Sequence, residues 1–148
     1  MPEDRTMNIA HFLTHKSNVA YLYNDFTLRQ ALEKMKHHGY TAIPVISREG
    51  QYIGTVCEGD FLWYLVRGEG NQPLQQIDVQ DVETMQLSDL PFSRQYEPVN
   101  ITATIDTLID KAVTQNFVPV VDDLGSFIGI ITRRDILRYF YQTVSQQE

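Results

Sequence analysis

The sequence predicts a mixed α/β protein in which one β-α-β-β-α unit occurs twice. Two observations support this fold class: short motifs recur at a constant spacing, and helical and strand-like hydrophobic patterns alternate within each copy. The 148 residues fit one domain, or two small units that share a core. A unit of about 60 residues buries too little surface to be stable alone. We therefore expect the two copies to pack sheet to sheet as a pseudo-symmetric pair.

Three landmarks of the first copy recur 75 residues later in the second: Pro44 as Pro119, Gly54 as Gly129, and Asp60 as Asp135. Upstream, Leu28 and Leu32 match Ile105 and Ile109, and a single two-residue deletion before Pro119 explains the different offset. We divide the chain into a first repeat with an N-terminal helix at residues 1–70, and a linker helix with a second repeat at residues 71–148.

Each repeat begins with a lead-in helix, a short strand and an amphipathic helix. We expect lead-in helices over Met7–Leu13 and Val79–Met85, and strands over Val19–Tyr23 and Val99–Ile101. The i, i+3, i+4, i+7 spacing of a helix face is present in both copies, at Leu28, Ala31, Leu32 and Met35 and at Ile105, Leu108, Ile109 and Ala112. Thr27 and Gln30 have capping-box spacing. Gly39 and Asn116 are expected to act as C-caps.

A hairpin and a final helix complete each repeat. We expect its strands at Ile43–Ile46 and Tyr52–Val56, and in the second copy at Phe117–Val121 and Phe127–Ile131. The early proline in the first strand of each hairpin predicts an edge strand or a first position. Final helices are expected to start near Asp60 and Asp135. Residues Gly68–Pro73 have the composition of a linker.

The composition excludes several functional classes. A net charge of −7 argues against a nucleic-acid or anionic-membrane surface. The single cysteine, Cys57, excludes an intrachain disulfide and a multi-cysteine zinc site. No apolar run approaches the roughly 20 residues of a membrane helix, and the first residues lack a secretory signal. We therefore expect a soluble, cytoplasmic protein.

The sequence offers little for catalysis or metal binding. His11 and His15 share a helical spacing, but a catalytic zinc site needs three protein ligands, so no metal is expected. Cys57 has no evident base and lies beside Glu58, which raises a thiol pKa, so we expect a buried, inert cysteine. We therefore predict no catalytic residue and no enzymatic activity.

A basic spot lies in the acidic half of the chain. Residues 75–148 contain five basic and eleven acidic residues, and three of the five are Arg133, Arg134 and Arg138. Thr132–Asp135 falls where a strand ends and a helix begins, and a helix N-terminus binds anions. The guanidinium group of an arginine adds paired N–H donors for a phosphate. The Asp135 carboxylate could accept hydrogen bonds from the two hydroxyls of a ribose. Thr-x-x-Asp is equally a capping box, and the arginines could be a solvated face.

The equivalent segment of the first copy, Cys57–Asp60, keeps the aspartate but lacks the hydroxyl and both arginines. Any anion site there should be weaker, so the sequence predicts one good pocket and one poor one.

Three segments, Gly39–Val45, Phe117–Asp122 and Gly129–Asp135, resemble the CBS domain, and the pair resembles a Bateman module. The resemblance runs from about Met7 to Tyr141. The layout is similar to the small stand-alone CBS proteins of Gram-positive bacteria, some of which are receptors for cyclic di-AMP.

This resemblance implies an adenine nucleotide in the cleft between the repeats. Thr132 would contact phosphate or ribose, Asp135 would hold the ribose hydroxyls, and Arg133 and Arg134 would face phosphate. The adenine pocket implied by the resemblance consists of Ala20, Tyr40, Thr41, Ala42 and Ile43. A second, weaker site would consist of Cys57, Asp60, Gln115, Asn116, Phe117 and Val118.

The resulting hypothesis is a regulatory module that senses AMP, ADP, ATP or cyclic di-AMP and signals to a partner protein. It needs no cofactor apart from this regulatory nucleotide. We expect a homodimer with the final helices at its interface. The alternatives are a ligand-free interaction scaffold and an enzyme that uses the cleft.

Overall fold

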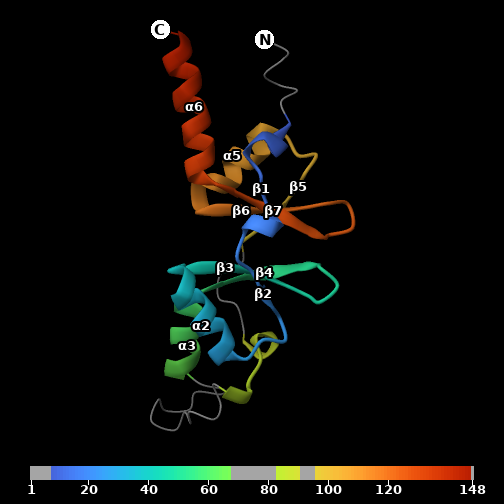
Figure 1. Cartoon of the computed structure of the whole chain (residues 1–148), viewed down its shortest axis with the longest axis vertical. Helices are drawn as coiled ribbons and strands as arrows, with labels where there is room; N and C mark the ends of the chain where they lie inside the picture. Colours follow the sequence, from blue (N-terminus) through green and yellow to red (C-terminus); the bar gives the residue numbers. More distant parts are fainter. Residues whose placement is uncertain (1–7, 68–82, 91–95, 148) are drawn as a thin grey trace. The chain divides into compact units, whose positions relative to one another are not determined.

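The computed structural model describes residues 8–67, 83–90 and 96–147 (Figure 1). The chain forms two compact units, one comprising Ala20–Gln95 and the other Met1–Val19 together with Tyr96–Glu148. The expected linker Gly68–Pro73, and most of the expected helix Val79–Met85, lie outside the described residues.

The unit at Ala20–Gln95 contains a three-stranded sheet in the order β2-β3-β4. Strand β2 (Leu22–Tyr23) is parallel to β3 (Ala42–Ile46), which is antiparallel to β4 (Tyr52–Cys57). The unit also contains the helices α2 (Leu28–His38) and α3 (Glu58–Arg67) and the 3-10 helix η4 (Leu87–Asp89). Its core is formed by apolar side chains from every one of these elements, including Leu22, Leu28, Val45, Val56, Phe61 and Leu87.

The second unit contains a four-stranded sheet in the order β1-β7-β6-β5. Its strands are β1 (Thr14–His15), β5 (Val99–Asn100), β6 (Phe117–Val121) and β7 (Phe127–Thr132). Its helices are α5 (Ile105–Thr114), α6 (Arg133–Gln147) and the 3-10 helices η1 (Ile9–Phe12) and η2 (Lys16–Asn18). The predicted mixed α/β class is confirmed: in the described part of the chain, one sheet with α2 and α3 represents the first repeat, and one sheet with α5 and α6 represents the second.

The start and end of α2 follow the sequence prediction. The Thr27 hydroxyl accepts a hydrogen bond from the Gln30 N–H at 3.1 Å, and the Gln30 side chain accepts one from the Thr27 N–H at 2.9 Å. Gly39 then ends the helix in the left-handed conformation, at φ 69°. Helix α5 differs, because its C-cap is Gln115 in an extended conformation. The prediction that Asn116 would act as the C-cap is therefore wrong.

The prolines do not lie in edge strands. Pro44 and Pro119 are third in β3 and β6, and both strands lie between two neighbours in their sheets. Strand β2 pairs only from Val45 onward, and β5 only from Val120 onward. Each proline therefore lies just before the residues of β3 or β6 that pair with β2 or β5. Its missing N–H does not interrupt the hydrogen bonds to those two strands.

The lead-in segments are exchanged between the repeats. The segment expected as a helix over Met7–Leu13 forms the short η1, and its Ile9 and Phe12 are buried in the core of the second repeat. Strand β1 follows and pairs with β7, where Thr14 lies opposite Ile130. This pairing needs Gly129, because a Cβ there would lie 2.2 Å from the Thr14 carbonyl oxygen. Reciprocally, Leu87 of η4 is buried in the core of the first repeat.

Candidate functional site

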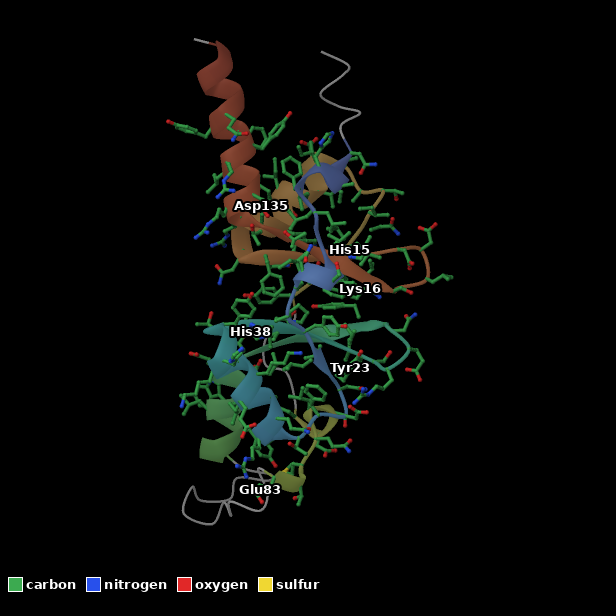
Figure 2. The ribbon with its side chains drawn as sticks, viewed as in Figure 1. His15, Lys16, Tyr23, His38, Glu83 and Asp135 are labelled. Carbon is green, nitrogen blue, oxygen red and sulfur yellow. The ribbon has the colours of Figure 1, made fainter. Side chains whose placement is uncertain are left out.

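The predicted nucleotide-binding segment lies where β7 passes directly into α6. Thr132 is the last residue of β7, and Arg133 is the first of α6. The Thr132 hydroxyl accepts a hydrogen bond from the Asp135 N–H at 3.1 Å, so Thr132 caps the helix. Figure 2 shows Asp135 on the first turn of α6.

The carboxylates of Asp135 and of its counterpart Asp60 differ in burial and in hydrogen bonding. Asp60 is only 2% exposed, and its carboxylate accepts a hydrogen bond from the Cys57 N–H at 2.8 Å. Asp135 is half-buried, and its carboxylate forms no hydrogen bond or ion pair with any described residue. The Asp60 carboxylate therefore completes a helix cap, whereas the Asp135 carboxylate is available to accept from a ligand.

Arg133 holds the end of a neighbouring helix. Its Nε donates to the Ala112 carbonyl at 2.7 Å, and its Nη2 donates to the Val113 carbonyl at 3.0 Å. Its Nη1 donates to Oδ1 of Asn116 at 3.0 Å. These contacts satisfy carbonyls that α5 leaves unpaired because it ends without a left-handed cap. Arg133 was expected to face phosphate, but three of its five N–H donors are engaged within the protein.

Arg134 is exposed, and within the described part of the chain its guanidinium has no ion pair or hydrogen bond. It lies in the first turn of α6, where backbone N–H groups and the helix dipole favour an anion. Of the two adjacent arginines, Arg134 is therefore the one whose donors are free for a phosphate.

The residues expected to form the adenine pocket lie in the Ala20–Gln95 unit. The exposed ring of Tyr40 is stacked on His38, with centroids 5.4 Å apart and an interplanar angle of 19°. Thr41 is exposed, and its carbonyl accepts from the Glu58 N–H at 3.0 Å. Ala20 and Ala42 are half-buried. Ile43 is fully buried, so its side chain belongs to the core rather than to a pocket surface.

The residues expected to form the weaker site are largely engaged within the protein. Val118 is fully buried, and the nearly buried ring of Phe117 packs on Tyr96 with centroids 4.9 Å apart. The Gln115 side chain accepts from the Glu97 N–H at 3.1 Å and donates to the Glu97 carbonyl at 3.1 Å. Cys57 is half-buried rather than buried as expected.

Each unit contains part of both predicted sites. In one unit, Thr132 lies opposite Phe117 across the β6–β7 pair. In the other, Ala42 lies opposite Cys57 across the β3–β4 pair. The structure thus brings together the residues that share a unit, and the assembly of whole sites from both units remains a prediction.

A pocket that the sequence did not reveal lies beside Asp135. It has a volume of about 320 Å³ and lies between residues 11–14 and α6, from which Asp135, Arg138, Tyr139 and Gln142 line it. Arg138 was noted only as part of the basic spot. His11 could not be connected to α6 from the sequence, because the pairing of β1 with β7 joins segments that are far apart in the chain.

Within residues 8–67, 83–90 and 96–147, no three His, Cys, Asp or Glu side chains are grouped so that they could hold a metal ion. None of the helices described there is both long and apolar enough to cross a membrane.

Comparison with known proteins agrees with the resemblance seen in the sequence. The family model of the CBS domain matches residues 10–67 and again residues 87–142. Cyclic di-AMP receptor B of Bacillus subtilis is 29% identical over 133 residues, which cover 88% of this chain and 84% of the relative. The chain spans only 55% and 52% of two archaeal relatives, from Methanopyrus kandleri and Methanocaldococcus jannaschii.

Solved structures show the same fold. CbpB in complex with c-di-AMP has a TM-score of 0.86 at 24% identity, covering 98% of this chain and 91% of that one. CBSX2 in complex with AMP has a TM-score of 0.70 at 23% identity, covering 92% of this chain and 97% of that one.

Proposed function

This chain belongs to the CBS-domain family, with two copies of the domain, and from that premise we propose that it is a regulatory protein that binds an adenine nucleotide. The observation that carries the proposal is the half-buried, unpaired carboxylate of Asp135, next to the free guanidinium of Arg134 at the start of α6. A hydroxyl acceptor beside an anion site suits a phosphorylated ribose.

The proposed roles follow from the chemistry of each group. The N-terminus of α6 and Arg134 bind phosphate, and Asp135 accepts from a ribose hydroxyl. Tyr40 provides an exposed aromatic face for adenine, beside Thr41, Ala42 and the half-buried Ala20. The counterpart site around Cys57 and Asp60 is weaker, because the Asp60 carboxylate already caps α3.

The candidate ligands are cyclic di-AMP and AMP, with ADP and ATP as further members of the class. Cyclic di-AMP receptor B and CbpB support the first, and CBSX2 supports the second. The regulatory output is proposed to pass to a partner protein. No catalytic role is proposed.

We also propose that the protein forms a homodimer through its helices. Each unit exposes large apolar side chains on its two α-helices: Leu32, Leu62 and Trp63 on α2 and α3, and Ile109, Val113, Leu137, Phe140 and Tyr141 on α5 and α6. A groove of about 180 Å³ lies among Ile109, Val113, Ile136 and Leu137. A second copy would cover these faces with the same kind of surface.

The test is a thermal unfolding series with cyclic di-AMP, AMP, ADP, ATP and S-adenosylmethionine. A ligand at 100 times its Kd should stabilise the protein by about 2.7 kcal/mol. Asp135→Asn and Arg134→Ala should each reduce this shift. The first replaces a charged carboxylate acceptor with a neutral amide, and the second removes the phosphate donor. Asp106→Asn is the control for Asp135→Asn, since Asp106 is an exposed acidic residue in the first turn of α5. If no nucleotide shifts the transition at saturation, the proposed nucleotide-binding function is wrong.

A further inference from the structure

The end of α2 fixes the backbone of Tyr40. The Tyr40 N–H donates to the Met35 carbonyl at 3.1 Å, and the Gly39 N–H donates to the Lys36 carbonyl at 3.2 Å. With Gly39 in the left-handed conformation, these two hydrogen bonds form a Schellman motif, which holds Tyr40 against the last turn of the helix. Figure 2 shows His38 at this end of α2, from which its ring reaches the ring of Tyr40.

The side chain of Tyr40 is covered on one face of its ring. The imidazole of His38 lies nearly parallel to the phenol ring, at an interplanar angle of 19°. Tyr40 nevertheless remains 43% exposed, and among the described residues no other ring contacts it and none forms a hydrogen bond with its hydroxyl. The stack on His38 therefore restrains the ring and leaves its other face available.

The second repeat has a different arrangement at the equivalent position. Tyr40 lies two residues before β3, and Gln115 lies two residues before β6. The Gln115 side chain is nearly buried and hydrogen-bonded to the backbone of Glu97. Two stacked, exposed rings are therefore not required for a β-α-β-β-α unit to fold, and their presence in the first repeat indicates a binding role.

We propose that His38 is a positioning residue for the adenine base, because it holds the Tyr40 ring in the orientation on which the base stacks. The inference rests on the proposed function, which assigns adenine to Tyr40. Aromatic rings stack in offset, nearly parallel pairs, so adenine on the open face of Tyr40 would extend the stack that His38 begins. A side chain that is already restrained loses less rotamer freedom when the ligand binds, so His38 raises the affinity without contacting the nucleotide.

The experiment is isothermal titration of the full chain with AMP, ATP and cyclic di-AMP. His38→Ala should weaken nucleotide binding by about threefold to tenfold, because the Tyr40 ring is then ordered only on binding. His38→Phe keeps a flat ring and should restore most of the affinity. His38→Lys supplies a cation without a ring and should not restore it. His37→Ala is the matched control, because the His37 ring meets His38 edge to face and does not contact Tyr40.

A second measurement follows the base itself. The C2 proton of adenine moves upfield in the NMR spectrum when the base stacks on an aromatic ring. At saturation, this upfield shift should be smaller in His38→Ala than in the unmodified chain, and His38→Phe should regain it. If His38 only stabilised the end of α2, the affinity could fall, but the shift of the bound nucleotide would stay the same.

The outcomes separate this inference from the proposed function. If the unmodified chain binds a nucleotide and His38→Ala binds it equally well, the positioning role is wrong and the proposed function stands. The same conclusion follows if His38→Lys restores the affinity and His38→Phe does not, because charge rather than stacking would then be responsible. Absence of binding by the unmodified chain overturns both. His38 is exposed at the end of a helix, so the three variants should fold normally.

Discussion

Arg133 and Arg134 are adjacent in the chain but differ completely in their surroundings. Arg133 donates to two carbonyls of α5 and to Asn116, whereas Arg134 has a free guanidinium in the described structure. From the sequence, both arginines were expected to face phosphate. The structure divides them into a residue that stabilises the fold and a residue that is available to a ligand.

Arg133→Ala should lower the free energy of unfolding by about 1–2 kcal/mol, because it leaves the α5 carbonyls without their donors. Arg134→Ala is the matched variant and should change stability by less than about 0.5 kcal/mol. Urea unfolding followed by circular dichroism gives both values. Equal losses in the two variants would show that Arg133 does not hold the end of α5.

Local chemistry explains which single residues could be predicted. The Thr27–Gln30 capping box and the Gly39 C-cap depend on neighbours within a few positions, and both are confirmed. The role of Arg133 depends on the end of α5, which is about 20 residues away in the chain. Asn116 was mistaken for a cap because the sequence does not show that an arginine supplies the missing donors.

At the scale of elements, strands and helices follow their hydrophobic patterns closely. The expected helix at Leu28–Met35 and the strand at Tyr52–Val56 are both present, with ends that differ by a few residues. The sequence also predicted lead-in helices over Met7–Leu13 and Val79–Met85. It could not show which repeat buries them, because periodicity identifies a buried face and not the partner that covers it.

Ile9→Ala and Leu87→Ala test the exchange of lead-in segments. Both side chains are fully buried, so each substitution should cost about 2–5 kcal/mol. Hydrogen exchange should show the larger loss of protection in β6 and β7 for Ile9→Ala, and in β3 and β4 for Leu87→Ala. The surface control is Leu124→Ala, at a side chain that is 79% exposed. If Ile9→Ala instead affected β3 and β4 most, its placement in the second unit would be wrong.

At the scale of the whole molecule, the exposed apolar helix faces bear on assembly. Leu62 is 62% exposed and Leu137 is 67% exposed, and they occupy equivalent positions of the two repeats. Solitary exposed apolar residues are common on proteins, but the same faces exposed in both repeats are typical of an interface.

The double variant Leu62→Glu and Leu137→Glu should convert the proposed homodimer into a monomer, because it would place charges in an apolar contact. Sedimentation velocity over a range of protein concentrations measures this change. Leu124→Glu adds a charge at an exposed turn and should leave the mass unchanged. A monomeric unmodified chain at every concentration would exclude the homodimer.

The repeat and the CBS family were predictable because the motifs that carry the resemblance are short, continuous segments and occur in both copies. The expectation that Thr132–Asp135 lies where a strand ends and a helix begins is confirmed, because Thr132 ends β7 and Arg133 begins α6. The pocket between residues 11–14 and α6 was not predictable, because it depends on a chain segment crossing to the other repeat's sheet.

This crossing has a consequence for the order in which the protein can fold during synthesis. Ala20–Gln95 is continuous in sequence, so the contacts within that unit need no residue that is synthesised after Gln95. Thr14 must wait for Ile130, near the other end of the chain, before β1 has a strand to pair with. Contacts of such long range form late and slowly. The segment Ile9–Thr14 is thus synthesised long before the strand on which it packs, and until that strand forms, Ile9 and Phe12 lack the core that buries them.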